Sequence, residues 1–422
     1  MRFLPSYINL KFFGWWIAFS GFFQLIWVSG TIFFGMSAFI DPIAEQYGWS
    51  RAAMAGAISL QRTESGIVGP FVGPIIDRFG ARAPMFVGTI LTTLGFFWLA
   101  RTDGSIVTFY FAFGTIALGV SIGTVITTTT IIGNWFIKFR STALTIAFLG
   151  TGLGGLLIPL LVWGIKVYSW RTILDYIAVI NLFIGFFVMI FMRHKPEQYG
   201  LLPDGIHKDV ISTNQISKYT NDSEISMNTK QILKEKSFWL INLSFGITGI
   251  ALSTVMVFAI PSLSSIGFDP YVGAFVLTAT SILLFIGRLI IGLLADSFDK
   301  RYLLCLTFAL IGTGTLLFGM LTEVWHIALF VILYGVGHGG TVPVRFAYLA
   351  DMYGRKSYGT VIGITTTTGA FFGILGPIYA GYIYDQYLDY KIAFTVIGIL
   401  TFLAIPLLLM VKKTQPVNKY IV

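Results

Sequence analysis

The sequence predicts an all-α membrane protein with twelve transmembrane helices in two pseudo-symmetric six-helix halves. Hydrophobic residues make up 55% of the 422 residues and charged ones only 11%, with a mean hydropathy of +0.80, which excludes an ordinary soluble domain. Apolar stretches of about 20 residues recur along the whole chain, and each can cross roughly 30 Å of hydrocarbon at about 1.5 Å per residue. An internal repeat, described below, divides the stretches six and six.

The apolar stretches define the expected helices. They cover 12–40, 52–74, 84–100, 107–133, 142–165, 172–192, 238–261, 271–295, 302–321, 325–348, 358–383 and 392–411. The first is longer than the hydrophobic region of a signal peptide and eleven more follow it, so we expect it to stay in the membrane.

The basic residues are distributed unequally between the two sides of this topology. With the N-terminus placed inside, twenty of the 28 Lys and Arg residues fall on the inner side and five on the outer side. The other three, Arg62, Arg288 and Arg345, lie within spans. The positive-inside rule therefore predicts that both termini are cytoplasmic, and the net charge of +9 requires no nucleic-acid partner.

One long polar stretch, 193–237, separates the first six spans from the last six and carries seven basic residues. We interpret it as a cytoplasmic linker between an N-terminal half, 1–192, and a C-terminal half, 238–422. It is too short and too poor in apolar residues for a catalytic domain.

The two halves share sequence features at nearly constant offsets. The segment 73–82, Gly-Pro-Ile-Ile-Asp-Arg-Phe-Gly-Ala-Arg, is echoed 219 residues later by 292–301, and Gly123-Thr124-Val125 is echoed 217 residues later by Gly340-Thr341-Val342. Parallel repeats with a binding site between them near mid-bilayer are typical of transporters.

The sequence contains none of the catalytic or metal-binding motifs that an intramembrane enzyme would need. Cys305 is the only cysteine, so no internal disulfide and no Cys-based metal site can form. No HExxH, paired Asp or Ser/His/Asp grouping occurs at membrane depth. We expect no enzymatic activity, no metal and no cofactor.

The segment from Gly73 to Arg82 resembles the signature loop of the major facilitator superfamily, G-x-x-x-D-R-x-G-x-R between the second and third helices. It falls in the matching loop, and its weaker copy falls between spans eight and nine. The resemblance covers essentially the whole chain and implies the major facilitator fold.

Within that superfamily the chain is similar to the monocarboxylate transporters and oxalate:formate antiporters. The likeness rests on Gly48-Trp49-Ser50-Arg51 before span two, on the stretch Pro196–Gly205 after span six, and on the arginine helix around Arg288 in span eight. It implies that Arg288 binds a substrate carboxylate. Three features of family members are missing: Leu284 replaces an acidic residue one turn before Arg288, and neither span one nor span eleven carries an internal cation.

Charges within the spans favour an anionic cargo. Glu64 is the only deep acid, against Arg62, Arg288 and Arg345. Arg288 lies eight residues before Asp296, about 12 Å by helical rise, which is near mid-bilayer. A guanidinium stays charged and can grip a carboxylate with two hydrogen bonds. The alternative for each Arg is snorkelling or a structural bond.

Other polar groups in the spans are further candidates. His338 can accept a proton or bond a neighbouring helix, and Tyr334 can donate to an anion or simply pack. Glu64 and Arg62 are assigned to coupling or gating, with a structural ion pair as the alternative for Glu64.

Five loop residues are assigned to gating between the halves: Asp77, Arg78, Arg82, Asp296 and Arg301. A loop Asp near helix N-termini can join the halves in one state and release them in the other. The alternative for the basic residues is that they only fix topology.

The sequence therefore predicts a secondary active transporter of small organic anions, a monocarboxylate such as lactate or pyruvate, working by proton symport or anion exchange. The alternatives are a dicarboxylate/formate-type antiporter, an exporter of a non-anionic small molecule, and a transporter-derived receptor. The expected partners are a small organic anion, protons as a candidate coupling ion and the lipid bilayer. We expect a monomer in a cell membrane, with a prokaryotic inner membrane favoured by the short loops.

Overall fold

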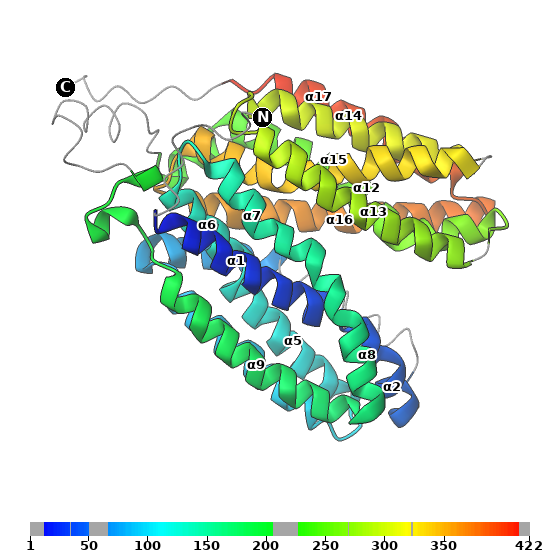
Figure 1. The fold of residues 1–422 in the computed structure, drawn as a ribbon. Coiled ribbons are helices and arrows are strands. Elements are labelled where there is room, and N and C mark those ends of the chain that lie inside the picture. The colour runs from blue at the N-terminus through cyan, green and yellow to red at the C-terminus, as the bar shows by residue number, and fades with distance from the viewer. Residues whose placement is uncertain are drawn as a thin grey trace, which may run out of the picture.

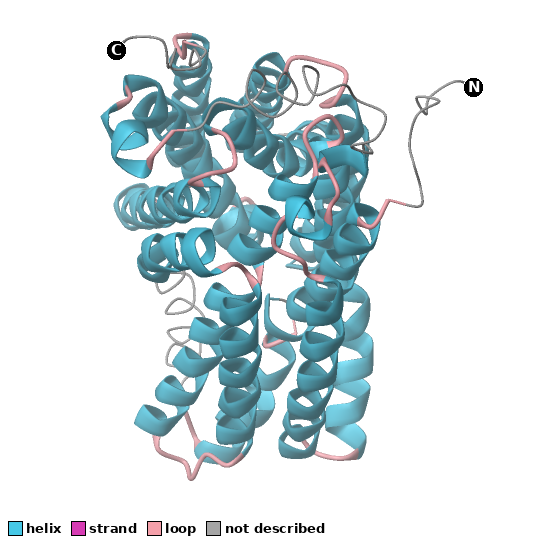
Figure 2. Ribbon diagram, turned by 90° about the vertical axis from the view of Figure 1, so that its left-hand side faces the viewer, coloured by secondary structure: helices cyan, strands magenta, loops and turns pink. Residues whose placement is uncertain are grey.

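The computed structural model describes residues 12–33, 35–49, 66–205, 227–268, 270–321 and 324–412. These residues are helical nearly throughout, and no strand occurs among them (Figure 2). Eleven of their helices are long and apolar enough to cross a membrane. The remaining predicted span, 52–74, lies partly outside the described residues, and its described part belongs to a helix over 66–79. The predicted all-helical, multi-pass fold is confirmed.

The first group of helices precedes residue 193. It comprises α1 (Gly14–Val28), a π-helical turn η1 (Ser29–Phe33), α2 (Ser37–Tyr47), the helix 66–79, α4 (Arg82–Ala100), α5 (Ile106–Gly123), α6 (Val125–Trp135), α7 (Arg140–Leu153), a 3-10 turn η2 (Gly154–Leu157), α8 (Ile158–Val167) and α9 (Trp170–Phe191).

Short elements connect this group to the second one. They are the 3-10 turns η3 (Pro196–Tyr199) and η4 (Pro203–Gly205) and the short helix α11 (Thr229–Lys234). The second group comprises α12 (Lys236–Ser265), α13 (Pro270–Leu294), α14 (Lys300–Gly319), α15 (Val324–Tyr353), α16 (Tyr358–Tyr387) and α17 (Lys391–Leu409).

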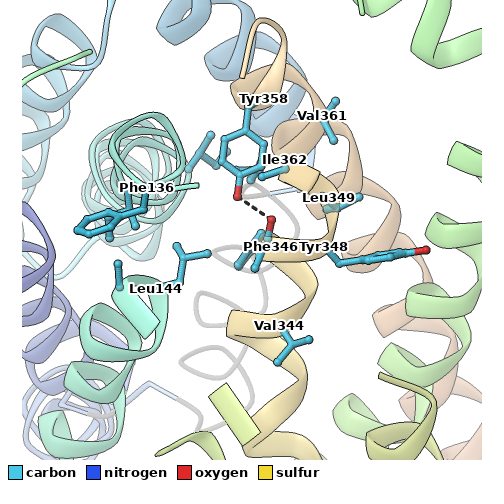
Figure 3. Close-up of a cluster of buried hydrophobic side chains, with 14 of the residues drawn as sticks. Phe136, Leu144, Val344, Phe346, Tyr348, Leu349, Tyr358, Val361 and Ile362 are labelled. Carbon is cyan, nitrogen blue, oxygen red and sulfur yellow. Dashed lines mark hydrogen bonds between the residues drawn. The ribbon is translucent and has the colours of Figure 1, made fainter. Parts of the chain in front are cut away.

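The two groups converge at one end and diverge at the other (Figure 1). We call the end that carries Asp77, Asp296 and Asp351 the latch end, and the opposite one the far end. At the latch end, one hydrophobic core contains residues of both groups. Figure 3 shows part of this core, where Phe136 and Leu144 of the first group face residues of α15 and α16. The other two cores among the described residues each belong to one group only. Hydrophobic packing therefore joins the halves at the latch end.

The helix ends agree with the sequence to within a few residues, with one exception. The first span was expected to run to residue 40 but ends at Phe33, and α2 is a separate helix. Thr124, with φ −118° and ψ −90°, breaks span four between α5 and α6. The Gly123 carbonyl at this break accepts a hydrogen bond of 3.0 Å from Gln24 Nε2, so a buried side chain satisfies the interrupted backbone.

Candidate substrate site and latch between the halves

Arg288 is buried between the halves, with 5% of its surface exposed. Its Nη1 donates to the Phe148 carbonyl oxygen on α7 at 2.6 Å and to the hydroxyl of Thr151. Its Nε lies 3.5 Å from the carbonyl oxygen of Gly339 on α15. Arg288 thus connects α13 with a helix of the other half, and its Nη2 has no hydrogen bond to any described residue.

Arg345 lies on α15 within the second half. Its Nη2 donates to the Thr365 carbonyl oxygen on α16 at 3.0 Å, and the guanidinium lies over the ring of Phe245, 4.7 Å from its centroid. Its Nε is buried without a hydrogen-bond partner among the described residues. Arg345 therefore bonds a neighbouring helix, one of the expected alternatives, and still has donors to offer.

No carboxylate of the described residues forms an ion pair with Arg288 or Arg345. The predicted acid at this depth, Glu64, lies outside the described residues, as does Arg62. A buried charge is costly unless it is paired. Within the described residues, each of the two guanidiniums therefore carries a positive charge without a carboxylate partner.

Tyr334 and His338 lie one turn apart on α15, and His338 directly precedes Gly339, whose carbonyl oxygen lies beside Arg288. Tyr334 is buried, donates to the carbonyl oxygen of Leu252 at 3.3 Å and stacks on Phe330. The imidazole of His338 lies edge-on to Tyr334, with 5.8 Å between ring centroids, and is partly accessible. In this conformation the Tyr334 hydroxyl has a structural partner, whereas His338 has no hydrogen bond to a described residue.

Asp77 caps the N-terminus of α16 in the other half. One carboxylate oxygen accepts from the Gly359 N–H at 2.9 Å, and the other from the N–H and hydroxyl of Thr360 at 2.9 and 2.7 Å. The first N–H groups of a helix have no partner within the helix and carry a partial positive charge, so an anion there is stabilised.

Asp296 makes the equivalent contact from the other half. Its two oxygens accept from the N–H groups of Ser141 and Thr142, both at 2.8 Å, at the N-terminus of α7. Burial raises the pKa of Asp296, although these hydrogen bonds and Lys300 lower it. We call the two contacts together the Asp latch. They join the halves at one end, and the gating role expected for the two aspartates stays a prediction.

The arginines of the repeated loops bind within their own halves. Arg82 Nε donates to the Met192 carbonyl oxygen at the end of α9, and Arg301 Nη1 to that of Val411 after α17, both at 2.9 Å. Arg301 and Val411 lie 219 positions after Arg82 and Met192, so the repeat extends to individual hydrogen bonds. Arg78 is exposed and lies over the ring of Phe79. Among the described residues, none of the three arginines forms a hydrogen bond across the halves, whereas both aspartates do.

The sequence analysis did not predict a third contact between the halves at the latch end. Arg140 is 2% exposed and donates to Asp351 on α15 at 2.7 Å, and Lys300 contacts the other oxygen of Asp351 at 2.8 Å. Arg140 also donates to the carbonyl oxygens of Gly133 and Phe136. Nothing in the spacing of Arg140 and Asp351 pointed to this pair.

The stretch after span six also contributes to this end. Glu197 pairs with Arg355 of the other half at 2.7 Å, and Arg355 donates to the Asn134 carbonyl oxygen at 2.8 Å. Asp204 accepts from three successive backbone N–H groups, 137–139, before α7. The sequence analysis singled out this stretch only for its resemblance to the monocarboxylate transporter group, and predicted no contact for it.

A profile of the Major Facilitator Superfamily matches residues 22–301 and 241–420. The chain belongs to this superfamily. It is a transporter and not an enzyme. Among curated major facilitator proteins, it is 24% identical to monocarboxylate transporter 13 of Bos taurus over 396 residues, covering 91% of this chain and 86% of the relative. It is also 24% identical to human monocarboxylate transporter 2 over 405 residues, covering 90% and 81%.

Solved major facilitator structures have the same fold. The human organic anion transporter MFSD10 superposes with a TM-score of 0.70 at 15% identity, over 94% of this chain and 99% of that one. A proton:xylose symporter superposes with a TM-score of 0.74 at 13% identity, over 97% of both chains. The predicted fold and the resemblance to monocarboxylate transporters are confirmed.

Proposed function

We propose that this major facilitator protein transports small organic anions with a carboxylate group by alternating access. The observation that carries the proposal is that Arg288, which is buried, and Arg345, which is half-buried with a buried Nε, have no carboxylate partner among the described residues. A substrate carboxylate would compensate this charge and fill the free donors. The names of the relatives, monocarboxylate transporters, agree with this substrate class.

Alternating access gives the latch a function. Because the Asp latch spans both halves, it can hold them together in one state and must break in the other. We propose that the latch end faces the cytoplasm, since most basic residues lie on that side. The conformation described is then closed to the cytoplasm.

The test is uptake of labelled lactate, pyruvate, formate and oxalate into proteoliposomes, with and without a pH gradient. We expect saturable uptake by the wild type and at least a hundredfold loss in Arg288→Ala, because a buried charge–charge contact contributes several kcal/mol, about 3–5 when one partner is removed. A response to the gradient indicates proton symport, and a requirement for internal anion indicates exchange. Normal uptake by a correctly inserted Arg288→Ala protein would refute the proposal.

Arg345 distinguishes the two kinds of anion. If both guanidiniums contact the substrate, Arg345→Gln should reduce oxalate transport far more than lactate transport, since only the dianion needs a second cation. Equal effects on both would limit Arg345 to a structural role. Flux of a neutral or cationic compound, with none of any acid, would favour the alternative of a non-anionic exporter.

A further inference from the structure

A groove of about 560 Å³ lies between α1, α7, α9 and α13 at the latch end. Its lining includes Trp15, Phe19, Ile146, Phe191 and Leu293, and only Ser20 and Thr142 add hydroxyl groups. The Ser20 hydroxyl already donates to the Ile17 carbonyl oxygen of its own helix. The volume is in the range of about 300–1,000 Å³ that holds small molecules, but the lining offers a substrate carboxylate no cation.

The groove faces the bilayer. Trp16, Phe19 and Leu293, which line it, are 57%, 49% and 43% exposed, and all lie on membrane-spanning helices. In such a position an aliphatic chain is the occupant that matches an apolar surface without losing hydrogen bonds.

Two basic side chains lie near the end of the groove where α9 ends and α7 begins. Arg193, two residues beyond Phe191, has its guanidinium 3.9 Å from the ring centroid of Phe13. Lys138 lies over the ring of Phe139, which contacts Trp15 of the groove with 6.4 Å between centroids. Neither Arg193 nor Lys138 forms a salt bridge with a described residue.

The carboxylates beside these residues accept hydrogen bonds from backbone N–H groups. Asp204 accepts the backbone N–H of Lys138 and of its two neighbours in sequence, and Asp296 accepts the N–H groups of Ser141 and Thr142. The N–H groups hold these carboxylates without neutralising them, whereas Lys138, which is exposed, and Arg193, which is half-buried, form no ion pair with a described residue, which leaves unpaired positive charge at this end of the groove. It complements the phosphate of an anionic lipid, whose headgroup lies at this depth when its acyl chain enters the apolar part.

We propose that this groove binds an anionic phospholipid, with an acyl chain against α1, α7, α9 and α13 and its phosphate at Lys138 and Arg193. Leu293 comes from the second half and lies three residues before Asp296, and Thr142 is the direct partner of Asp296. The groove is complete only while the Asp latch holds α13 against α7, so the lipid favours the latched conformation.

Native mass spectrometry tests the site on the full-length transporter released from bilayers of equal phosphatidylglycerol and phosphatidylcholine with identical acyl chains. We expect one phosphatidylglycerol to be retained in preference to phosphatidylcholine. The double variant Lys138→Gln/Arg193→Gln should lose this preference roughly tenfold, because each basic residue near the bilayer contributes to anionic-lipid binding. Equal retention of the two lipids by the wild type would overturn the proposal.

Two further variants separate the groove from general lipid contact. Leu293→Trp fills the groove and should abolish retention, whereas Ile290→Trp, on the same helix, 51% exposed and outside the lining, should retain the lipid. Retention by Leu293→Trp would place the lipid elsewhere. Asp296→Ala should weaken retention without touching the lipid, and unchanged retention would refute the dependence on the latch.

Discussion

Arg288 donates a hydrogen bond of 2.6 Å to the carbonyl oxygen of Phe148, and the two residues belong to different halves of the molecule. The candidate carboxylate receptor is therefore also a contact between the halves in this conformation. A carboxylate that binds Arg288 through both Nη atoms must compete with α7 for Nη1. Under the proposed function, substrate binding and the contact between the halves are linked through a single side chain.

Thr151→Val tests this competition. The substitution keeps the shape of the side chain but removes the hydroxyl that contacts Arg288. Because a hydrogen bond to a charged group contributes about 1.5–3 kcal/mol and the Phe148 carbonyl remains, we expect the KM for a transported carboxylate to fall about threefold to tenfold. Thr151→Ser, which keeps a hydroxyl, is the matched control and should behave as the wild type. A KM unchanged by Thr151→Val would show that α7 does not compete for Arg288.

The Asp latch predicts a shift in conformation when its acceptors are removed. Asp77→Ala or Asp296→Ala leaves helix N–H groups without their anionic partner, a loss of about 1.5–3 kcal/mol for each charge-assisted bond. Spin labels at Ala83 and Lys356, both exposed and in different halves, should therefore report longer distances in either variant. The labels require replacement of Cys305 by Ser. If the distances in these variants equal those in the labelled protein that keeps both aspartates, the aspartates do not hold the halves together.

The helix crossing beside Asp77 predicts a steric effect. A Cβ at Gly73 would lie 2.5 Å from the Cα of Thr360, closer than backbone atoms can approach. Gly73→Ala should therefore separate the helix 66–79 from α16 and reduce the latched population in the same distance measurement. Gly155→Ala is the control, because a Cβ at Gly155 meets nothing within 4 Å. If both variants behave alike, close packing at Gly73 is not required for closure.

His194 predicts a pH dependence of stability. It lies after α9 beside Gly80, and burial together with the charge of Lys195 lowers its pKa from 6.5 to about 4. The folded protein therefore binds this proton more weakly than the unfolded chain does. The stability contribution of neutral His194 is present above pH 6.5 and is lost as the pH falls toward 4.

Thermal unfolding at pH 7.5 and pH 5 measures this effect. On acidification, we expect the unfolding temperature of the wild type to fall by roughly 1–3 °C more than that of His194→Gln, which has no imidazole to titrate. The shift is small because about 1 kcal/mol corresponds to roughly 2–4 °C for about 150–250 residues and to less in a longer chain. An equal loss in both proteins would mean that His194 does not contribute.

The sequence predicted the spans well because membrane helices require long uninterrupted apolar runs. It did not predict the interruptions within them. Thr124, the π-helical turn at Ser29–Phe33 and the 3-10 turn at Gly154–Leu157 occur in apolar sequence that reads as continuous helix. At the break beside Thr124, the Gly123 carbonyl oxygen is satisfied by Gln24 of another helix, so no local signal marks the break.

The candidate site was predicted in part. Arg288 and Arg345 stood out because a charge within an apolar run is costly and rare. Arg140 did not, since it lies at a helix end among many topogenic basic residues, and its pairing with Asp351 connects positions 211 apart. Such a pair forms only when α7 and α15 meet. The roles of Glu64 and Arg62 stay predictions, because both lie outside the described residues.

The sequence by itself determined the number and length of the spans, the duplicated loops and the surplus of positive charge at membrane depth. These follow from local composition, because each helix satisfies its own backbone and must match the bilayer alone. Only the tertiary structure decided that Asp77 and Asp296 cap helices of opposite halves, and that Arg288 is held by Phe148. Those contacts depend on how two bundles pack against each other, a relationship between distant segments that spacing along the chain does not encode.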